Sequence, residues 1–346
     1  MTRHLLLAVS CLALLACGSA SSPGEDEAFE TPEGTWTFVP VEGTQCGNGT
    51  TAGVGVNLGA RRDQVFIYLQ GGGACWDALT CLGLPLATRI NETYGQAAFD
   101  EDVGTLQATG MLDRNDPANP FREASWIFVP YCTGDLHAGH SSKAYNPLQP
   151  DRMVHHRGGD NLTAFLARME ATFEDPERVW LAGSSAGGFG AQLNFDEVQR
   201  SFPDTQLHVL ADSAQPVDPE GELWGKLQEA WSVKFPEGCE GCETSAPALL
   251  DFLATRHPDA RVGLLAYERD STLSPFFGLS AEELQSRTRA LVAAQAGRAN
   301  FRSFVLPDAA HVMLDSYLTL TAPDATPLRT WVNQWATGDA AWKSAP

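Results

Sequence analysis

The sequence predicts an α/β protein in which a mostly parallel sheet carries helices on both faces. Eight short apolar segments, rich in β-branched and aromatic residues, alternate along the chain with segments of helical periodicity. Strands covered on both faces are continuously apolar, and alternating strands and helices are typical of parallel sheets joined by crossover helices. With 346 residues, 43% of them hydrophobic, the chain is long enough for one large domain.

The strands are expected at residues 36–41, 53–57, 65–70, 126–131, 179–182, 207–211, 261–267 and 301–306. The helices are expected at residues 160–173, 186–200, 246–257 and 281–296. In the first of these helices, apolar side chains recur at the spacing of one helical face. Because we find no internal repeat and no linker after residue 34, we expect a single catalytic domain over residues 35–346.

The N-terminus has the features of an export signal. Arg3 precedes an apolar run at residues 5–15 that is too short to span a bilayer as a helix. The run ends in Leu-Leu-Ala-Cys, which resembles the site at which bacterial signal peptides are cleaved and the cysteine is lipidated. We expect a signal peptide at residues 1–16 and a lipid on Cys17. The alternative is an ordinary signal peptide with a chance cysteine.

The segment after Cys17 is rich in serine, glycine, proline and acidic residues, so residues 17–34 are expected to be a lipidated tether. Gly18 stands where an aspartate usually signals inner-membrane retention, which favours the outer membrane or cell surface, reached through the lipid only. The chain has 23 basic and 43 acidic residues, a formal net charge of −20. Such a surface repels phosphate backbones, and nucleic acid is therefore not an expected partner.

A Gly-x-Ser-x-Gly motif at residues 183–187 lies between a predicted strand and a predicted helix. In this context the serine occupies a sharp, strained turn with its hydroxyl exposed, and the flanking glycines remove side chains that would clash. Ser185 is therefore the candidate nucleophile. The amide of Ala186, at the start of the helix, is a candidate donor to an oxyanion. The alternative is a flexible glycine- and serine-rich loop.

A triple glycine at residues 71–73 follows the strand predicted at 65–70. Such a tract lets backbone amides approach a tetrahedral intermediate, so Gly72 and Gly73 are expected to complete the oxyanion hole. The alternative is a flexible surface turn. Trp76, close behind, is a candidate stacking face for a sugar ring, although a core tryptophan fits the sequence equally well.

The base and its orienting acid should follow the nucleophile in the order serine, acid, histidine. His311 follows the last predicted strand and is the candidate base, whereas His257 is expected to cap a helix. Asp270 follows the penultimate strand and is the preferred acid. Asp212 follows the strand before it and is the alternative, unless it ties its own loop as an Asx turn.

Six cysteines remain in the expected mature domain, and an even number in an exported chain indicates disulfides. Six cysteines allow 15 pairings, so spacing alone leaves the connectivity open. The Cys239-x-x-Cys242 spacing favours a local disulfide over half a zinc site because no second such pair exists. His137, His140, His155 and His156 could ligate a metal, but no carboxylate flanks them at ligand spacing. We expect no metal and no cofactor.

Four segments resemble the pectin acetylesterase/Notum family of carbohydrate and lipid-adduct esterases. They are LQGGGACWDALTC at 69–81, VPYCTGDLHAGH at 129–140, LAGSSAGGFGA at 181–191 and LADSAQPVD at 210–218. The resemblance implies an α/β-hydrolase fold with a catalytic triad and oxyanion amides, which by position are Ser185, Asp270, His311, Gly72, Gly73 and Ala186. It also implies the disulfides Cys75–Cys81 and Cys46–Cys132.

The motifs and the resemblance together predict a serine carboxylesterase that removes acetyl groups from a polysaccharide such as pectin. The alternatives are an esterase for longer acyl chains on a lipid adduct and a surface binding protein on an inactive scaffold. The charge of −20 disfavours a polyanionic substrate, so a neutral or weakly charged acylated carbohydrate is the expected partner of a monomeric enzyme.

Overall fold

The computed structural model describes residues 27–346. The expected signal peptide, the expected lipid site at Cys17 and most of the expected tether lie outside these residues. Among the described helices, none has the length and apolar character needed to cross a membrane.

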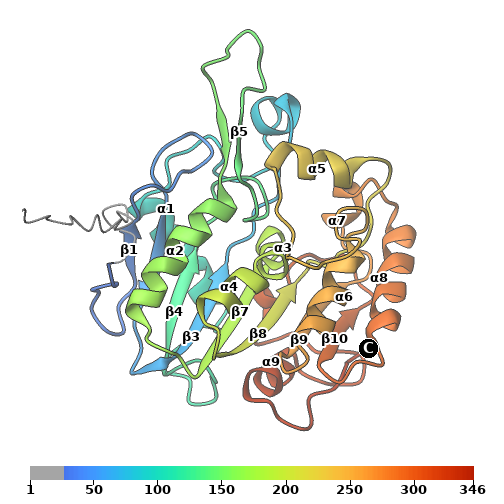
Figure 1. The fold of residues 1–346 in the computed structure, drawn as a ribbon. Coiled ribbons are helices and arrows are strands. Elements are labelled where there is room, and N and C mark those ends of the chain that lie inside the picture. Colours follow the sequence, from blue (N-terminus) through green and yellow to red (C-terminus); the bar gives the residue numbers. More distant parts are fainter. Residues whose placement is uncertain (1–26) are drawn as a thin grey trace, which may run out of the picture.

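An eight-stranded sheet forms the centre of the molecule, with the strand order β1-β2-β4-β3-β7-β8-β9-β10 (Figure 1). The strands are β1 (Thr37–Pro40), β2 (Gly53–Asn57), β3 (Arg61–Leu69), β4 (Ala124–Val129), β7 (Arg178–Ser184), β8 (Gln206–Asp212), β9 (Val262–Tyr267) and β10 (Phe301–Leu306). β1 and β2 are antiparallel to their neighbours, and the other six strands are mutually parallel. The loops that follow the parallel strands therefore meet at one edge of the sheet, where such folds bind ligands.

Helices cover both faces of the sheet. They are α1 (Gln96–Ala108), α2 (Gly158–Thr172), α3 (Ala186–Leu193), α4 (Phe195–Ser201), α5 (Leu223–Trp231), α6 (Pro247–Arg256), α7 (Leu273–Phe276), α8 (Ala281–Gln295) and α9 (Leu328–Thr337). In Figure 1, α2, α4 and α6 lie in front of the sheet. On the other face, Phe99 of α1 packs edge-on against Phe128 of β4. The indole of Trp180 in β7 donates to the carbonyl of Ala336 in α9 at 3.0 Å.

The described residues also contain three smaller elements, of which a hairpin is drawn at the top of Figure 1. The hairpin of β5 (Ser141–Lys143) and β6 (Val154–His156) projects away from the body of the molecule. A π-helical turn, η1 (Leu79–Gly83), follows β3. A 3-10 turn, η2 (Leu314–Ser316), follows β10.

The predicted fold class is confirmed, since all eight predicted strands are present in the mostly parallel sheet. The helix predicted at residues 186–200 is instead two helices, α3 and α4. They separate at Asn194, whose side-chain amide donates to the carbonyls of His137 at 3.0 Å and Gly190 at 2.9 Å. An asparagine that bonds to backbone groups competes with the helical ladder, which is why the apolar periodicity did not reveal the break.

The end of the expected tether differs from the prediction because it packs against the domain. Phe29 is buried, and its backbone N–H donates to Thr172 Oγ1 at 2.8 Å. The guanidinium of Arg168 lies over the Phe29 ring at 4.8 Å from its centroid. Glu33 pairs with Leu58 in an isolated bridge. One aromatic anchor and a few backbone contacts thus dock a segment whose composition predicted no structure.

Three disulfides join the six cysteines of the domain. They are Cys46–Cys132, Cys75–Cys81 and Cys239–Cys242, the pairs named above from the resemblance and the local spacing. The first joins the segment between β1 and β2 to the loop after β4. The second closes the segment that follows the triple glycine.

Candidate active site

The turn between β7 and α3 has the geometry that the motif predicted. Ser185 has φ 54° and ψ −123°, a region that non-glycine residues rarely adopt. A Cβ on Gly187 would lie 1.9 Å from the carbonyl oxygen of Leu69, and one on Gly183 would lie 2.3 Å from the carbonyl oxygen of Gly187. Both motif glycines are therefore required, because a side chain at either position would collide with a neighbouring backbone carbonyl. The strained turn leaves Ser185 at the carboxyl end of β7, 8% exposed.

The structure brings Asp270 and His311 together from the loops after β9 and β10. Asp270 Oδ2 lies 2.7 Å from His311 Nδ1, and its Oδ1 accepts the backbone N–H groups of Thr272 and Leu273, each at 2.9 Å. Asp270 is completely buried, so this arrangement holds the carboxylate in one orientation. A carboxylate on Nδ1 leaves the lone pair on Nε2, which is the tautomer that a general base needs.

Ser185 and His311 both line a cavity of about 330 Å³ at this edge of the sheet. The rest of its wall comes from Tyr68, Gln70, Gly71, Gly72, Gly73, Asp102, Thr105, Leu106, Phe128, Ser184, Thr272, Val312 and Asp315. The predicted nucleophile, the predicted base and the glycine tract therefore open onto one space. Of the two candidate acids, Asp270 is the one that contacts His311, at the ring nitrogen Nδ1.

The triple glycine packs directly onto the serine turn. A Cβ on Gly71 would lie 2.4 Å from the carbonyl oxygen of Ser184, and one on Gly73, which has φ +75°, would lie 2.0 Å from the carbonyl oxygen of Leu86. The backbone N–H groups of Gly72, Gly73 and Ala186 have no acceptor among residues 27–346. Free amide donors beside a serine are what an oxyanion hole consists of.

Asp212, the alternative acid, makes no hydrogen bond to His311 in the part of the chain that the structure describes. Its carboxylate accepts the Ser184 hydroxyl at 2.8 Å and the backbone N–H groups of Met313 at 2.9 Å and Leu314 at 3.1 Å. Burial raises the pKa of Asp212 to about 6, against the opposing effect of these donors. Tyr68 donates its hydroxyl to Ser184 Oγ at 2.9 Å, and burial raises the pKa of that phenol.

Sequence reasoning missed this network. It treated Ser184 only as the neighbour of the nucleophile and did not consider Tyr68. A signal existed, because Ser184 and Asp212 end two strands that became neighbours, β7 and β8. Their pairing could not be known before the strand order.

Trp76 does not line the cavity. Its ring is partly buried and meets Phe276 of α7 edge-on, with centroids 5.6 Å apart. The side chains that do face the cavity include Asp102 and Thr105 of α1, a helix that was not predicted. The proposed sugar-stacking role of Trp76 therefore has no geometric support at the cavity wall.

The four clustered histidines are each engaged by the protein. His137 Nε2 lies 2.8 Å from the carbonyl oxygen of Gln70, and His140 Nδ1 lies 2.7 Å from Asp160 Oδ1. His155 Nδ1 lies 2.8 Å from the hydroxyl of Ser142. The contact of His137 braces the site, because Gln70 precedes the glycine tract and the His137 side chain also packs against Gly190 of α3.

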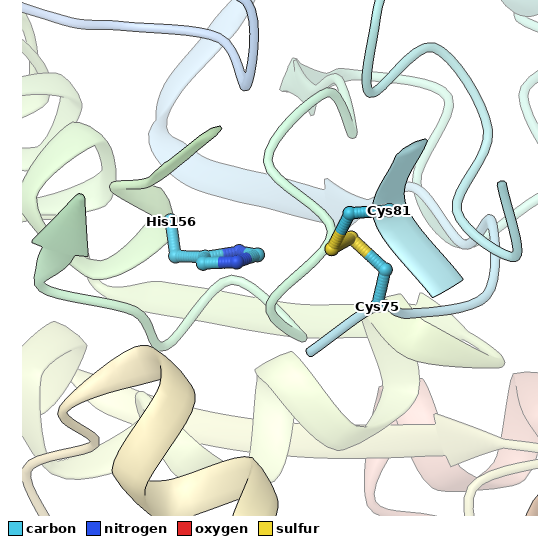
Figure 2. Close-up of side chains that lie close together, drawn as sticks. All are labelled: Cys75, Cys81 and His156. Carbon is cyan, nitrogen blue, oxygen red and sulfur yellow. A yellow bond between two sulfur atoms is a disulfide. The ribbon is translucent and has the colours of Figure 1, made fainter. Parts of the chain in front are cut away.

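His156 lies beside the Cys75–Cys81 disulfide (Figure 2). Its Nδ1 is 2.9 Å from the carbonyl oxygen of Thr133, and its Nε2 is 2.8 Å from the Tyr145 hydroxyl. Burial lowers the pKa of His156, so the ring is neutral at neutral pH. Because the two sulfurs are bonded to each other and both ring nitrogens have partners, the trio fits a structural role better than metal ligation.

The predicted capping role of His257 matches its position. It is the C-cap residue of α6, and its Nε2 lies 2.5 Å from Asp196 Oδ1 of α4. This contact joins two helices on one face of the sheet, away from the cavity residues.

The fold and the serine turn define an α/β-hydrolase. The structure of the Wnt deacylase Notum from Drosophila superposes with a TM-score of 0.65 over 90% of this chain and 95% of that chain. At 16% identity, this match shows the fold alone.

The chain belongs to the pectinacetylesterase family, whose model matches residues 33–222. This range includes the serine turn and the triple glycine but ends before Asp270 and His311. The chain is therefore a member of a carboxylesterase family.

Two curated relatives have the name palmitoleoyl-protein carboxylesterase. The notum2 protein of Xenopus laevis is 28% identical over 218 residues, which cover 56% of this chain and 42% of that protein. NOTUM of Homo sapiens is 27% identical over 181 residues, which cover 49% of this chain and 33% of that protein. The alignments thus span less than half the length of either relative.

Proposed function

We propose that this protein is a serine carboxylesterase that removes acetyl or other short acyl groups from a polysaccharide. The observation that carries the proposal is the single cavity onto which Ser185, His311 and the free amides of the glycine tract open, with Asp270 hydrogen-bonded to His311 at 2.7 Å.

The reaction is a two-step acyl transfer. His311 Nε2 takes the proton of the Ser185 hydroxyl as the oxygen attacks the ester carbonyl, and Asp270 stabilises the imidazolium that forms. The amides of Gly72, Gly73 and Ala186 donate to the developing oxyanion. His311 then protonates the departing alcohol, and it finally activates a water molecule that releases the acid from Ser185.

The cavity favours a short acyl group. At about 330 Å³ it lies at the small end of ligand pockets, which range over about 300–1,000 Å³. Asp102, Thr105 and Asp315 line it, and the carboxylate of Asp102 is paired with Arg89. An alkyl chain laid against Asp315 would remove water from its carboxylate without replacing the hydrogen bonds of that water, which is unfavourable. The carbohydrate part of the proposal rests on the family match.

A longer acyl chain is the second candidate, because the curated relatives are named for a palmitoleoyl adduct. One structural feature also favours it. Leu79, Leu84 and Leu86 follow the glycine tract and are 61%, 68% and 50% exposed. Apolar side chains grouped beside a reactive site are suited to contact with an acyl chain.

Acetate release from acetylated xylan and pectin, compared with hydrolysis of an octanoyl ester, separates the two candidates. We expect the acetyl substrates to be turned over faster. A clear preference for the octanoyl ester would reject the short-acyl proposal and support the longer chain. Absence of turnover on every ester would favour the third alternative, a binding protein on an inactive scaffold.

Ser185→Ala is the control for the chemistry. We expect it to fold normally and to lose about 10⁴-fold or more in kcat, because no other group replaces the nucleophile. Undiminished turnover in this variant would reject Ser185 as the nucleophile while leaving the substrate comparison valid.

We also propose that the protein is exported and lipidated at Cys17. Its three disulfides support an oxidising compartment, in which such bonds persist. Mass spectrometry of the protein made with its own N-terminus tests this, since the expected mature chain begins at a lipid-modified residue 17. An unmodified residue 17 would reject the anchor.

A further inference from the structure

Asp212 connects the two segments that carry the proposed nucleophile and the proposed base. Its backbone carbonyl accepts the N–H of Ser185 at 2.8 Å, and its carboxylate accepts the hydroxyl of Ser184. The same carboxylate accepts the N–H groups of Met313 and Leu314, which come two and three residues after His311. One residue at the end of β8 thus binds both sides of the site.

The next residue extends the same connection. Ser213 Oγ accepts the backbone N–H of Val312 at 2.9 Å and lies 3.3 Å from Asp212 Oδ1. Val312 has φ +64°, which is unfavourable for a β-branched residue and requires the surrounding contacts to hold it. Three consecutive amides after His311 are therefore fixed from the end of β8.

Folding stability does not explain this buried charge. Burial raises the pKa of Asp212 from 3.8 to about 6. A carboxyl group whose pKa is higher in the folded state favours folding most below pH 3.8, and this contribution is lost as the pH rises through about 6. At neutral pH the ionised Asp212 therefore disfavours folding. The hydrogen bonds that its carboxylate accepts instead indicate a role in the candidate active site.

We propose that Asp212 is a positioning residue that holds the loop carrying His311 against the turn carrying Ser185. The inference rests on the esterase function proposed above. In that reaction the imidazole must stay within reach of the serine hydroxyl, and small displacements of a base lower turnover steeply. Asp212 has no hydrogen bond to the imidazole among residues 27–346; it holds the loop through the N–H groups of Met313 and Leu314, and its charge also interacts with His311.

Protonation of Asp212 weakens this clamp, because one of its two oxygens then carries a hydrogen and is a poorer acceptor for the loop N–H that faces it. Titratable groups on the surrounding elements are Tyr68 on β3, Tyr267 on β9, and His311 and Asp315 on the loop after β10. Both tyrosines stay neutral at acidic and neutral pH, because burial raises the pKa of each. The acid limb of kcat should therefore include the protonation of Asp212, whose pKa burial raises to about 6.

Asp212→Asn tests the proposal with p-nitrophenyl acetate as the substrate. The amide NH₂ would face one of the two loop N–H groups, so we expect kcat to fall about 10- to 100-fold while KM changes little. The acid limb should also lose the contribution of Asp212 near pH 6. Asp308→Asn, which changes an exposed carboxylate between β10 and His311, is the matched control and should retain both kcat and the acid limb of the unsubstituted protein.

Ser184→Ala is a second variant that keeps the carboxylate and stays informative if Asp212→Asn does not fold. The Ser184 hydroxyl lowers the pKa of Asp212, so its removal should move the acid limb to higher pH. Wild-type kcat in Asp212→Asn, or an acid limb unmoved in Ser184→Ala, would overturn the proposal. Failure of the esterase function itself is distinguishable, because the unsubstituted protein would then turn over no ester, or Ser185→Ala would remain active.

Discussion

The carboxylate of Asp270 holds the imidazole of His311 through a hydrogen bond to Nδ1. Both of its oxygens are occupied, Oδ2 by His311 Nδ1 and Oδ1 by the amides of Thr272 and Leu273. The amides fix the carboxylate, and the carboxylate fixes the ring. Asp212 is equally buried but directs its oxygens to the backbone of the histidine loop. These two carboxylates lie at the ends of neighbouring strands, but their replacement should have different effects on kcat.

The first prediction separates these two residues. Asp270→Asn should lower kcat by about 10⁴-fold, because an amide in place of the carboxylate favours the wrong tautomer of His311. Steady-state kinetics on p-nitrophenyl acetate measures the loss, with Asp308→Asn as the control. A smaller loss in Asp270→Asn than in Asp212→Asn would show that the acid has been misassigned.

At the scale of the element, the serine turn depends on glycines whose backbone touches β3. Gly187, in the first turn of α3, lies so close to Leu69 that a Cβ would be 1.9 Å from its carbonyl oxygen. That contact is between backbone atoms of a helix and a strand, and no rotamer can relieve it.

The second prediction is therefore that Gly187→Ala destabilises the protein by about 1–3 kcal/mol or more and also lowers kcat. Gly225→Ala is the matched control, since Gly225 lies in α5 with nothing within 4 Å of an added Cβ. The control should stabilise the fold by about 0.5–1 kcal/mol. Urea unfolding of both variants measures the difference, and equal midpoints would contradict the argument from close approach.

At the scale of the whole molecule, the disulfides close loops of very different length. Cys46 and Cys132 are 86 residues apart, whereas Cys239 and Cys242 are three residues apart. A cross-link restricts the unfolded chain more when the loop is longer.

The third prediction is that replacing both Cys46 and Cys132 by serine lowers the free energy of unfolding by about 2–5 kcal/mol. The corresponding replacement of Cys239 and Cys242 should have a smaller effect. Denaturant unfolding measured by tryptophan fluorescence compares the two variants. A larger loss at the short loop would show that chain entropy does not govern the ranking.

The net charge of −20 also acts over the whole molecule, because its field extends beyond any one contact. The fourth prediction is that acetate release from an anionic acetylated pectin rises with salt, while release from a neutral acetylated xylan changes little. Salt screens the repulsion between two negative surfaces over about 10 Å at 0.1 M. Equal salt dependence with both polymers would remove charge as a determinant of substrate choice.

The sequence by itself determined the strands, the α/β class and the segments that carry the candidate site. Each of these depends on local information: the continuous apolar runs, the glycines that the turn at Ser185 requires, and the position of His311 after the last strand. Local composition also suggested a tether that extends to residue 34. The end of that segment differs, because Phe29 packs against α2.

Only the tertiary structure decided between Asp270 and Asp212 as the partner of His311. Both follow parallel strands at the same edge of the sheet, and the distinction lies in hydrogen bonds between residues 41 and about 100 positions apart. The cavity wall from α1 and the position of Trp76 against Phe276 were likewise decided by packing between distant segments. A sequence motif specifies a turn, but the direction of a side chain depends on neighbours that only the folded chain supplies.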